Sequence, residues 1–158
     1  MRAPASGAIA GFPFSAASFR DVVIDAVVGL ESGGPGDAYG VFLRQVAAGS
    51  YLAFLVTPDR RSSVIVVEDG ATRVLQEGEI PADAPFAEGL DGPNRLTVVA
   101  IGPCVACIVN GFVLTGVIVE PRFKAGLAGV LLAHASPHAE SRMALLWAQV
   151  RAVLADQA

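Results

Sequence analysis

Two pairs of neighbouring carboxylates could act together in hydrolysis: Glu68-Asp69, and Glu77 with Glu79. Retaining glycosidases hold two carboxylates about 5 Å apart, one as the nucleophile and the other as the acid and base. Glu68 and Asp69 stand directly before Gly70 at an expected turn, where Asp is common. We expect Glu77 and Glu79 in a long acidic loop, so neither pair is held inside a strand. We therefore predict no catalytic residues and interpret both pairs as solvated charges.

The two histidines, His134 and His138, flank Ala-Ser-Pro in an expected loop. A nucleophilic triad needs a Ser or Cys, a histidine and an acid, and two histidines this close together seldom serve one triad. No third or fourth ligand is spaced as a zinc site requires. We interpret both histidines as surface residues and predict no zinc.

Cys104 and Cys107 form a Cys-x-x-Cys motif, which in thioredoxin-like proteins stands at the start of a helix after a strand. Here the motif lies inside an expected β-hairpin. Residues three apart in a strand are about 10 Å from each other and face opposite sides, which is too far for a disulfide without a bulge. We predict two buried free thiols, which would be unusual in an oxidising compartment.

Tyr39, Arg44 and Tyr51 are the candidates for a ligand-binding surface. Aromatic rings offer flat apolar area for a sugar, and the arginine fork matches a carboxylate. The same residues could instead complete a core, because Tyr at alternating strand positions is common there.

Calcium is the metal to consider, since Asp37, Asp59 and Asp91 lie in expected loops and Ca²⁺ takes carboxylate and carbonyl oxygens. None of these loops is rich in oxygen ligands, and Asp at a turn usually caps its own backbone. We predict no cofactor, with calcium as the alternative.

The elements that would position these residues are β-strands along most of the chain. In residues 22–30 every second side chain is apolar, while Asp25 lies on the opposite face. Strand 95–101 is apolar on both faces, which predicts a central place in a sheet. Asp69-Gly70 and Asn110-Gly111 predict tight hairpin turns, because both central residues of a type I′ turn need positive φ. Further strands are expected at 38–46, 50–57, 63–68, 72–76, 104–109, 112–119 and 127–134, with a long loop at 78–93.

Two segments allow a helical interpretation. Residues 96–119 carry no charge and are long enough to span a bilayer as a helix. Gly102-Pro103 and Asn110-Gly111 interrupt the segment, and β-branched residues dominate it, so we predict strands and no transmembrane span. Residues 141–154 fit one helix face as well as a strand, and their alanine content favours a helix.

Composition limits the class of protein. The 158 residues fit one domain, and 53% of them are hydrophobic while only 16% are charged. The net charge is −4 and no run of Lys or Arg occurs, which argues against nucleic acid as a partner. Pro4, Ser6 and Gly7 interrupt the first ten residues, so no signal peptide is predicted in this chain.

Several runs of the chain, in this order, resemble the concanavalin A-like lectin/glucanase superfamily, particularly laminin G-like and family 16 glycoside-hydrolase-like domains of bacterial surface proteins. They are DVVIDAV at 21–27, YGVFLR at 39–44, YLAFLV at 51–56, NRLTVVA at 94–100, VNG at 109–111 and FKAGLAG at 123–129. The resemblance covers about residues 20–153, which leaves 1–19 as an N-terminal extension or first strand.

The resemblance implies an all-β jelly roll, a sandwich of two curved antiparallel sheets whose concave face or loop rim binds glycans in some relatives and proteins in others. It implies that residues 141–154 form a final strand that returns toward the N-terminus, and we follow it there. It also implies a cell-surface or otherwise extracytoplasmic location. The Glu-x-Asp-x-x-Glu motif of the family's hydrolases is absent from the sequence.

We therefore expect a non-catalytic binding module that docks on a protein partner or a cell-envelope glycan. Two alternatives stay open. The first is a structural subunit of a larger or self-associating assembly, which the high hydropathy favours. The second is a divergent sugar-active hydrolase whose carboxylates come from separate strands.

Overall fold

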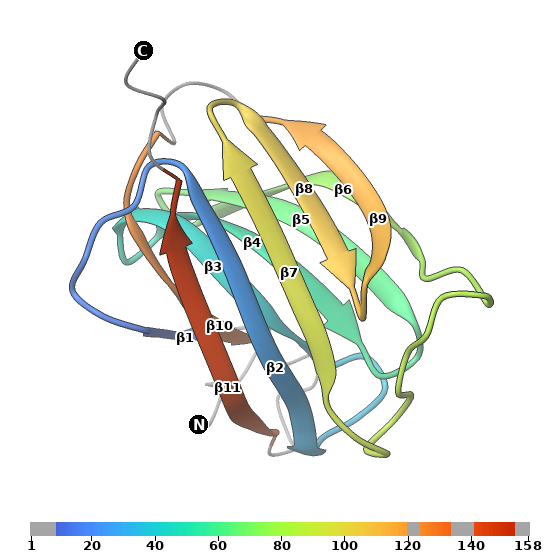
Figure 1. Cartoon of the computed structure of the whole chain (residues 1–158). Helices are drawn as coiled ribbons and strands as arrows, with labels where there is room; N and C mark the ends of the chain where they lie inside the picture. The colour runs from blue at the N-terminus through green and yellow to red at the C-terminus, as the bar shows by residue number, and fades with distance from the viewer. Residues whose placement is uncertain (1–8, 120–123, 134–140, 154–158) are drawn as a thin grey trace.

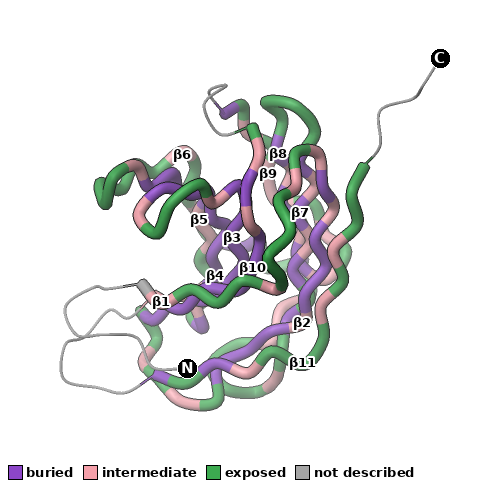
Figure 2. The backbone as a smooth tube through the Cα atoms, turned by 90° about the vertical axis from the view of Figure 1, so that its left-hand side faces the viewer, coloured by how far each residue is buried: buried purple, intermediate pink, exposed green. Residues whose placement is uncertain are grey.

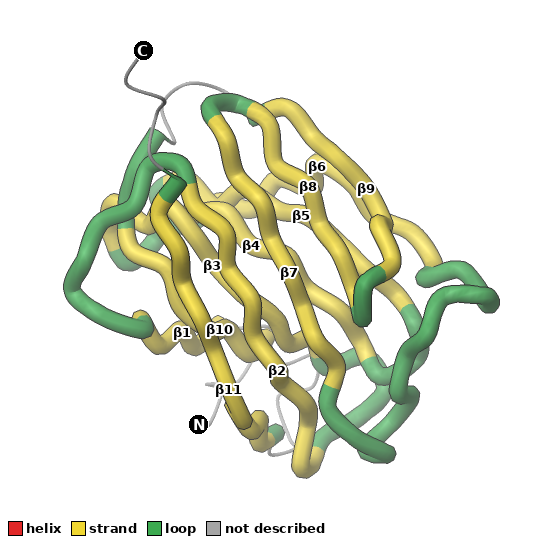
Figure 3. Tube along the Cα trace, viewed as in Figure 1, coloured by secondary structure: helices red, strands yellow, loops and turns green. Residues whose placement is uncertain are grey.

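Turns rich in Gly, Asp and Asn divide the chain into antiparallel strands. The computed structural model describes residues 9–119, 124–133 and 141–153, and all its regular elements are strands (Figure 3). They are β1 (Ile9–Pro13), β2 (Val22–Ser32), β3 (Ala38–Ala47), β4 (Ser50–Thr57), β5 (Arg61–Glu68), β6 (Ala71–Glu79), β7 (Asn94–Ile101), β8 (Cys104–Val109), β9 (Phe112–Ile118), β10 (Leu127–Ala133) and β11 (Arg142–Ala152).

The strands form two sheets packed face to face (Figure 1). The six-stranded sheet has the order β1-β10-β3-β4-β5-β6, and the five-stranded sheet has the order β11-β2-β7-β8-β9. All neighbouring strands pair antiparallel, and β7 lies at the centre of its sheet as predicted. The predicted two-sheet sandwich is confirmed.

The main core fills the space between the sheets, because alternate residues of each strand point inward. In β2 the inward residues are those that the sequence pattern places on one face, and all are at most 6% exposed. The six-stranded sheet meets them with Val41, Leu52 and Phe54, which are at most 1% exposed. Figure 2 shows this buried layer between the two sheets.

Both predicted hairpin turns are present. Asn110 (φ 47°) and Gly111 (φ 83°) join β8 to β9, and Asp69 (φ 49°) and Gly70 (φ 83°) join β5 to β6. The charge-free segment 96–119 is divided among β7, β8 and β9. No helix in the described part of the chain has the length and hydropathy that crossing a bilayer requires.

The structure confirms the C-terminal strand and corrects one boundary. β11 pairs with β2 over nearly its whole length, so pairing with a formed strand outweighs its alanine content. The predicted loop at 78–93 starts too early in the sequence, because the observed strand β6 continues through Glu79. Glu77 and Glu79 are therefore strand residues, paired opposite Ser63 and Arg61 of β5.

A buried hydrogen bond joins the two sheets across the core. Asn94, the first residue of β7, donates from Nδ2 to the hydroxyl of Tyr39 on β3 at 2.8 Å. The Asn94 amide also pairs with Ala87, accepting from its N–H at 2.8 Å and donating to its carbonyl at 3.0 Å. Both Asn94 and Tyr39 are at most 1% exposed, so neither can exchange this bond for one with water.

We predict that Tyr39→Phe lowers the free energy of unfolding by about 1 kcal/mol, the usual net value of one buried hydrogen bond. The matched control is Tyr51→Phe, because Tyr51 is 5% exposed yet makes no side-chain hydrogen bond with the described residues. Its variant should unfold at the same or a higher urea concentration. Equal losses in both variants would contradict the bridging role of Tyr39.

Candidate functional site

The structure separates the three residues predicted to share a ligand-binding surface. Tyr39 points inward between the sheets, while Tyr51 lies on the outer face of the six-stranded sheet. Side chains alternate between the two faces along a strand, and paired residues of neighbouring strands point to the same face. Tyr39 is paired with Val56, which lies in the main core, whereas Tyr51 is paired with Val67, which lies in the outer cluster. Tyr39 is thus a core residue, and burial raises the pKa of its hydroxyl.

The Arg44 guanidinium does not face solvent, contrary to the prediction from the sequence. It has φ 53° at an irregularity in the β3–β4 pairing and is 2% exposed. Its guanidinium donates to the carbonyl of Arg20 at 3.2 Å and to the carbonyl of Gly102 at 2.6 Å, and burial lowers its pKa. Arg44 therefore ties the end of the six-stranded sheet to the chain before β2 and to the β7–β8 turn.

The six-stranded sheet is curved. In Figure 2 its edge strands β1 and β6 project to one side, away from the five-stranded sheet, with the remaining strands between them. The outer face of this sheet carries a second apolar cluster, separate from the main core, made of Phe42, Tyr51, Ala53, Leu55, Ile65, Val67 and Leu131. We call this face the concave face.

A polar cavity of about 270 Å³ lies at one end of the concave face, where β4 turns into β5. Donors and acceptors from three strands meet there: Thr57 ends β4, Arg61 and Ser63 belong to β5, and Glu77 belongs to β6. The cavity is also lined by Gly36, Asp59 and Ser62. This set is not recognisable from the sequence, in which Glu77 is expected in a loop and Arg61 before the strand that begins at residue 63.

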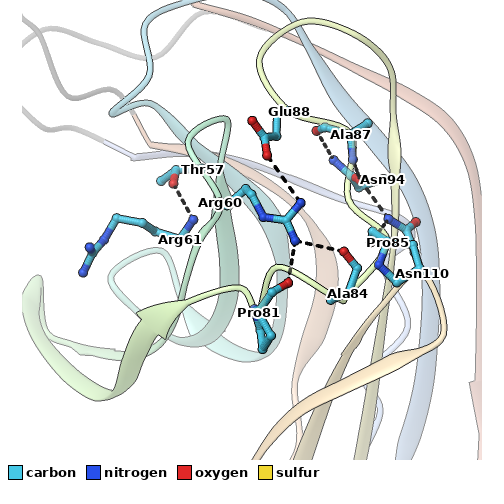
Figure 4. Close-up of polar contacts among 10 residues, drawn as sticks. All are labelled: Thr57, Arg60, Arg61, Pro81, Ala84, Pro85, Ala87, Glu88, Asn94 and Asn110. Carbon is cyan, nitrogen blue, oxygen red and sulfur yellow. Dashed lines mark hydrogen bonds and ion pairs between the residues drawn. The ribbon is translucent and has the colours of Figure 1, made fainter.

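Hydrogen bonds fix the turn that forms this cavity. The Thr57 hydroxyl bonds the Asp59 carboxylate and accepts the Arg61 backbone N–H at 3.2 Å. Arg60, with φ 63°, donates to the carbonyls of Pro81 at 2.5 Å and Ala84 at 2.9 Å (Figure 4). The turn and the loop that follows β6 are thereby held to each other at the rim.

A second cavity of about 230 Å³ lies at the opposite end of β4. It is lined by Gly11, Phe42, Gln45, Ala48, Tyr51 and Leu131. The rings of Phe42 and Tyr51 are 6.0 Å apart and tilted by 60°. Burial raises the pKa of the Tyr51 hydroxyl, so this group stays protonated over the physiological range.

The three loop aspartates considered for calcium make separate local hydrogen bonds. Asp37 accepts the Gly34 N–H at 2.9 Å and bonds the Ser141 hydroxyl. Asp59 bonds Thr57, and the backbone N–H of Asp91 donates to Glu88. Among residues 9–119, 124–133 and 141–153, no group of three or more His, Cys, Asp or Glu side chains could hold a metal ion. His134 and His138 lie outside the described residues.

The two cysteines differ from the prediction in one respect. Both are free, and Cys107 is buried, which raises the pKa of its thiol to about 12. Cys104 is exposed rather than buried, because the odd spacing places the two residues on opposite faces of β8.

The outer face of the five-stranded sheet has a different character. Its charged centre is the Asp25 carboxylate, 5% exposed, which accepts from Arg95 Nε at 3.1 Å and Thr97 at 2.5 Å. Arg151 lies 3.6 Å from the same carboxylate, and Arg95 covers the Trp147 ring at 5.7 Å. Beside this network is an apolar groove of about 270 Å³, lined by Val99, Ile101, Cys104, Val105, Ala106, Gly116, Val117 and Ile118.

Comparison with solved structures shows the concanavalin A-like jelly-roll fold shared by lectins and glucanases. The chain is similar to the carbohydrate-binding module CBM66 from Bacillus subtilis, with a TM-score of 0.75, 15% identity, and coverage of 96% of this chain and 91% of that one. It is similar to the laminarinase catalytic domain from Thermotoga maritima, with a TM-score of 0.64, 11% identity, and coverage of 88% and 66%.

It is also similar to sheep galectin-11, with a TM-score of 0.55, 10% identity, and coverage of 92% and 98%. No protein-family model matches the sequence, and no curated protein matches it significantly. The structural neighbours therefore include binding modules, lectins and hydrolases, and at these identities they establish the fold alone.

We predict that the Asp25 network stabilises the protein in a pH-dependent way. The hydrogen bond from Arg95 lowers the pKa of Asp25 below its ordinary value. The stabilisation should be complete above the unfolded pKa of about 3.9 and be lost as the pH falls through the lower folded value.

The substitution Asp25→Asn should lower the free energy of unfolding by about 1–2 kcal/mol at pH 7, since both arginines are half-exposed and partly screened. Urea denaturation of both proteins between pH 7 and pH 2.5 should show the difference shrinking toward the acid end. A difference that is constant over this range would contradict the assignment.

Proposed function

We propose that this chain is a non-catalytic carbohydrate-binding module that holds a glycan on the concave face of the six-stranded sheet. The observation that carries the proposal is the polar cavity of Thr57, Arg61, Ser63 and Glu77 at the end of that face. Sugar hydroxyls both donate and accept hydrogen bonds. The cavity offers a donor in Arg61, an acceptor in Glu77 and the Ser63 hydroxyl, which can do either, while the Thr57 hydroxyl already donates to Asp59.

Two observations support a sugar as the proposed ligand. The structural neighbours of this chain include a carbohydrate-binding module and a galectin. The cavity is small, and apart from Gly36 its described lining residues are polar or charged, whereas the centre of a protein interface is usually apolar and larger. A glycan ligand would in turn place the protein at the cell surface or elsewhere outside the cytoplasm.

The arrangement of carboxylates favours binding over hydrolysis. A glycosidase keeps its acid carboxylate in an apolar pocket and sets a second carboxylate across the scissile bond. Glu77 and Glu79 are both exposed on β6, the edge strand of the sheet. Neither therefore lies in the apolar pocket that the acid carboxylate of a glycosidase occupies.

The first test is a glycan array probed with the labelled protein, followed by variants of the polar cavity. Arg61→Ala and Glu77→Gln should each weaken binding of the retained glycan about tenfold, because each removes a charge-assisted hydrogen bond. The matched controls are Arg142→Ala and Glu31→Gln, which alter exposed residues of the five-stranded sheet and should not change affinity. Absence of any retained glycan, or equal losses in the controls, would overturn the proposal.

Self-association with a second copy is a second candidate function, favoured by β9. β9 is an edge strand without a charged residue or proline, whereas β1 ends in Pro13, and β6 and β11 carry charges. Natural sheets protect their edges with such residues. Ile118 and Val113 on β9 are 80% and 64% exposed, next to the apolar groove, so two copies could pair β9 with β9 without charge repulsion.

Light scattering at several concentrations tests this second candidate. A dimer that becomes monomeric in the Ile118→Lys variant would support it, since lysine on an edge strand opposes pairing. The control is Val46→Lys, which changes an exposed apolar residue (61% exposed) near the β3–β4 turn of the other sheet. A monomer at every concentration would exclude self-association.

A further inference from the structure

We infer that the Tyr51 cavity is a separate subsite that takes the acetamido group of an N-acetylated sugar. This inference rests on the proposed glycan-binding role of the concave face. It adds the chemical class of the sugar and a second set of residues at the other end of the sheet.

The starting observation is an almost fully buried tyrosine whose hydroxyl has no hydrogen-bond partner among the described residues. Tyr51 is 5% exposed, and its side chain makes no hydrogen bond with any residue that the structure describes. Burying a hydroxyl without a hydrogen bond is unfavourable, so such groups are rare in folded proteins. Tyr39, at similar burial, has Asn94 as its partner. The contrast indicates that the Tyr51 hydroxyl is satisfied by something that enters the cavity.

The cavity walls define the chemistry of that occupant. None of the lining residues in the described part of the chain is charged, which disfavours an ionic ligand. Among the described side chains that line the cavity, the second polar one is Gln45, whose amide also makes no hydrogen bond with the described residues and can both donate and accept. Phe42, Leu131 and Ala48 supply the smaller, apolar part of the lining. The occupant therefore combines hydrogen-bonding groups with a small apolar part.

An acetamido group has this combination of properties. Its carbonyl oxygen accepts a hydrogen bond from a hydroxyl or an amide, its N–H donates to an amide oxygen, and its methyl group prefers an apolar wall. A plain sugar hydroxyl would satisfy Tyr51 but would leave the apolar wall uncovered. A volume of about 230 Å³ is below the usual range for drug-sized ligands, and it suits one substituted sugar ring.

The Tyr51 cavity and the polar cavity are distinct places. Tyr51 and Thr57 both belong to β4 and are six residues apart, which separates them by about 20 Å along an extended strand. The apolar residues Ala53 and Leu55 lie between them on the same face. A substitution at one cavity therefore leaves the other intact, and the two can be tested independently.

The experiment is an NMR titration of the isotopically labelled protein with N-acetylglucosamine and N-acetylgalactosamine, each compared with its parent hexose. The acetamido sugars should shift the backbone amides of Gly11, Gln45 and Ala48 and bind at least about fivefold more tightly than glucose or galactose. Tyr51→Phe, which removes only the hydroxyl, should weaken acetamido binding about fivefold. Tyr39→Phe is the matched control and should leave that affinity unchanged.

Equal affinities for the acetamido sugars and their parent hexoses would overturn the inference, as would an unchanged affinity in Tyr51→Phe. If array glycans are retained through Arg61 and Glu77 while no acetamido preference appears, only this inference fails. If neither the array nor the titration finds a sugar, the proposed function fails with it. Thermal unfolding of each variant keeps these outcomes separate from misfolding, since Tyr51→Phe loses no hydrogen bond to the described residues.

Discussion

The Asn94 amide is the polar group on which the arrangement of this sandwich depends most. It is fully buried, yet it contacts the other sheet through Tyr39, the long loop through Ala87, and the β8–β9 turn through Asn110. In an interior held together by non-directional apolar contacts, such a bond set specifies one relative position of the parts. It helps to hold the loop after β6, which Arg60 also attaches at the rim of the polar cavity.

The two outer faces of the sandwich differ in where they place their apolar and charged side chains. The outer face of the six-stranded sheet carries a cluster of buried apolar side chains, with a cavity at each end of β4. The five-stranded sheet leaves Ile101 and Ile118 in solvent and places its one buried carboxylate, Asp25, under two arginines. The first arrangement suits a small polar ligand, and the second suits contact with another surface.

Tyr39 and Tyr51 differ in their hydrogen-bond partners and not in their burial. Both rings are buried, and burial raises the pKa of both hydroxyls. The Tyr39 hydroxyl takes part in a hydrogen bond between the sheets. Tyr51 lines a cavity, and its hydroxyl makes no hydrogen bond with the described residues. Both tyrosines are candidates from the sequence because of their ring chemistry. The sequence alone does not show which of them has a hydrogen-bond partner in the protein.

Local chemistry determined a large part of this fold. Alternating apolar residues in β2 and the Asp69-Gly70 and Asn110-Gly111 turns depend on neighbours in sequence, so they could be predicted without any tertiary contact. The role of Arg44, the strand character of Glu77 and the sheet position of β11 depend on partners far along the chain. Only the packed structure decides these, because register and burial are set by the neighbouring strand. The polar cavity, assembled from β4, β5 and β6, belongs to this second group for the same reason.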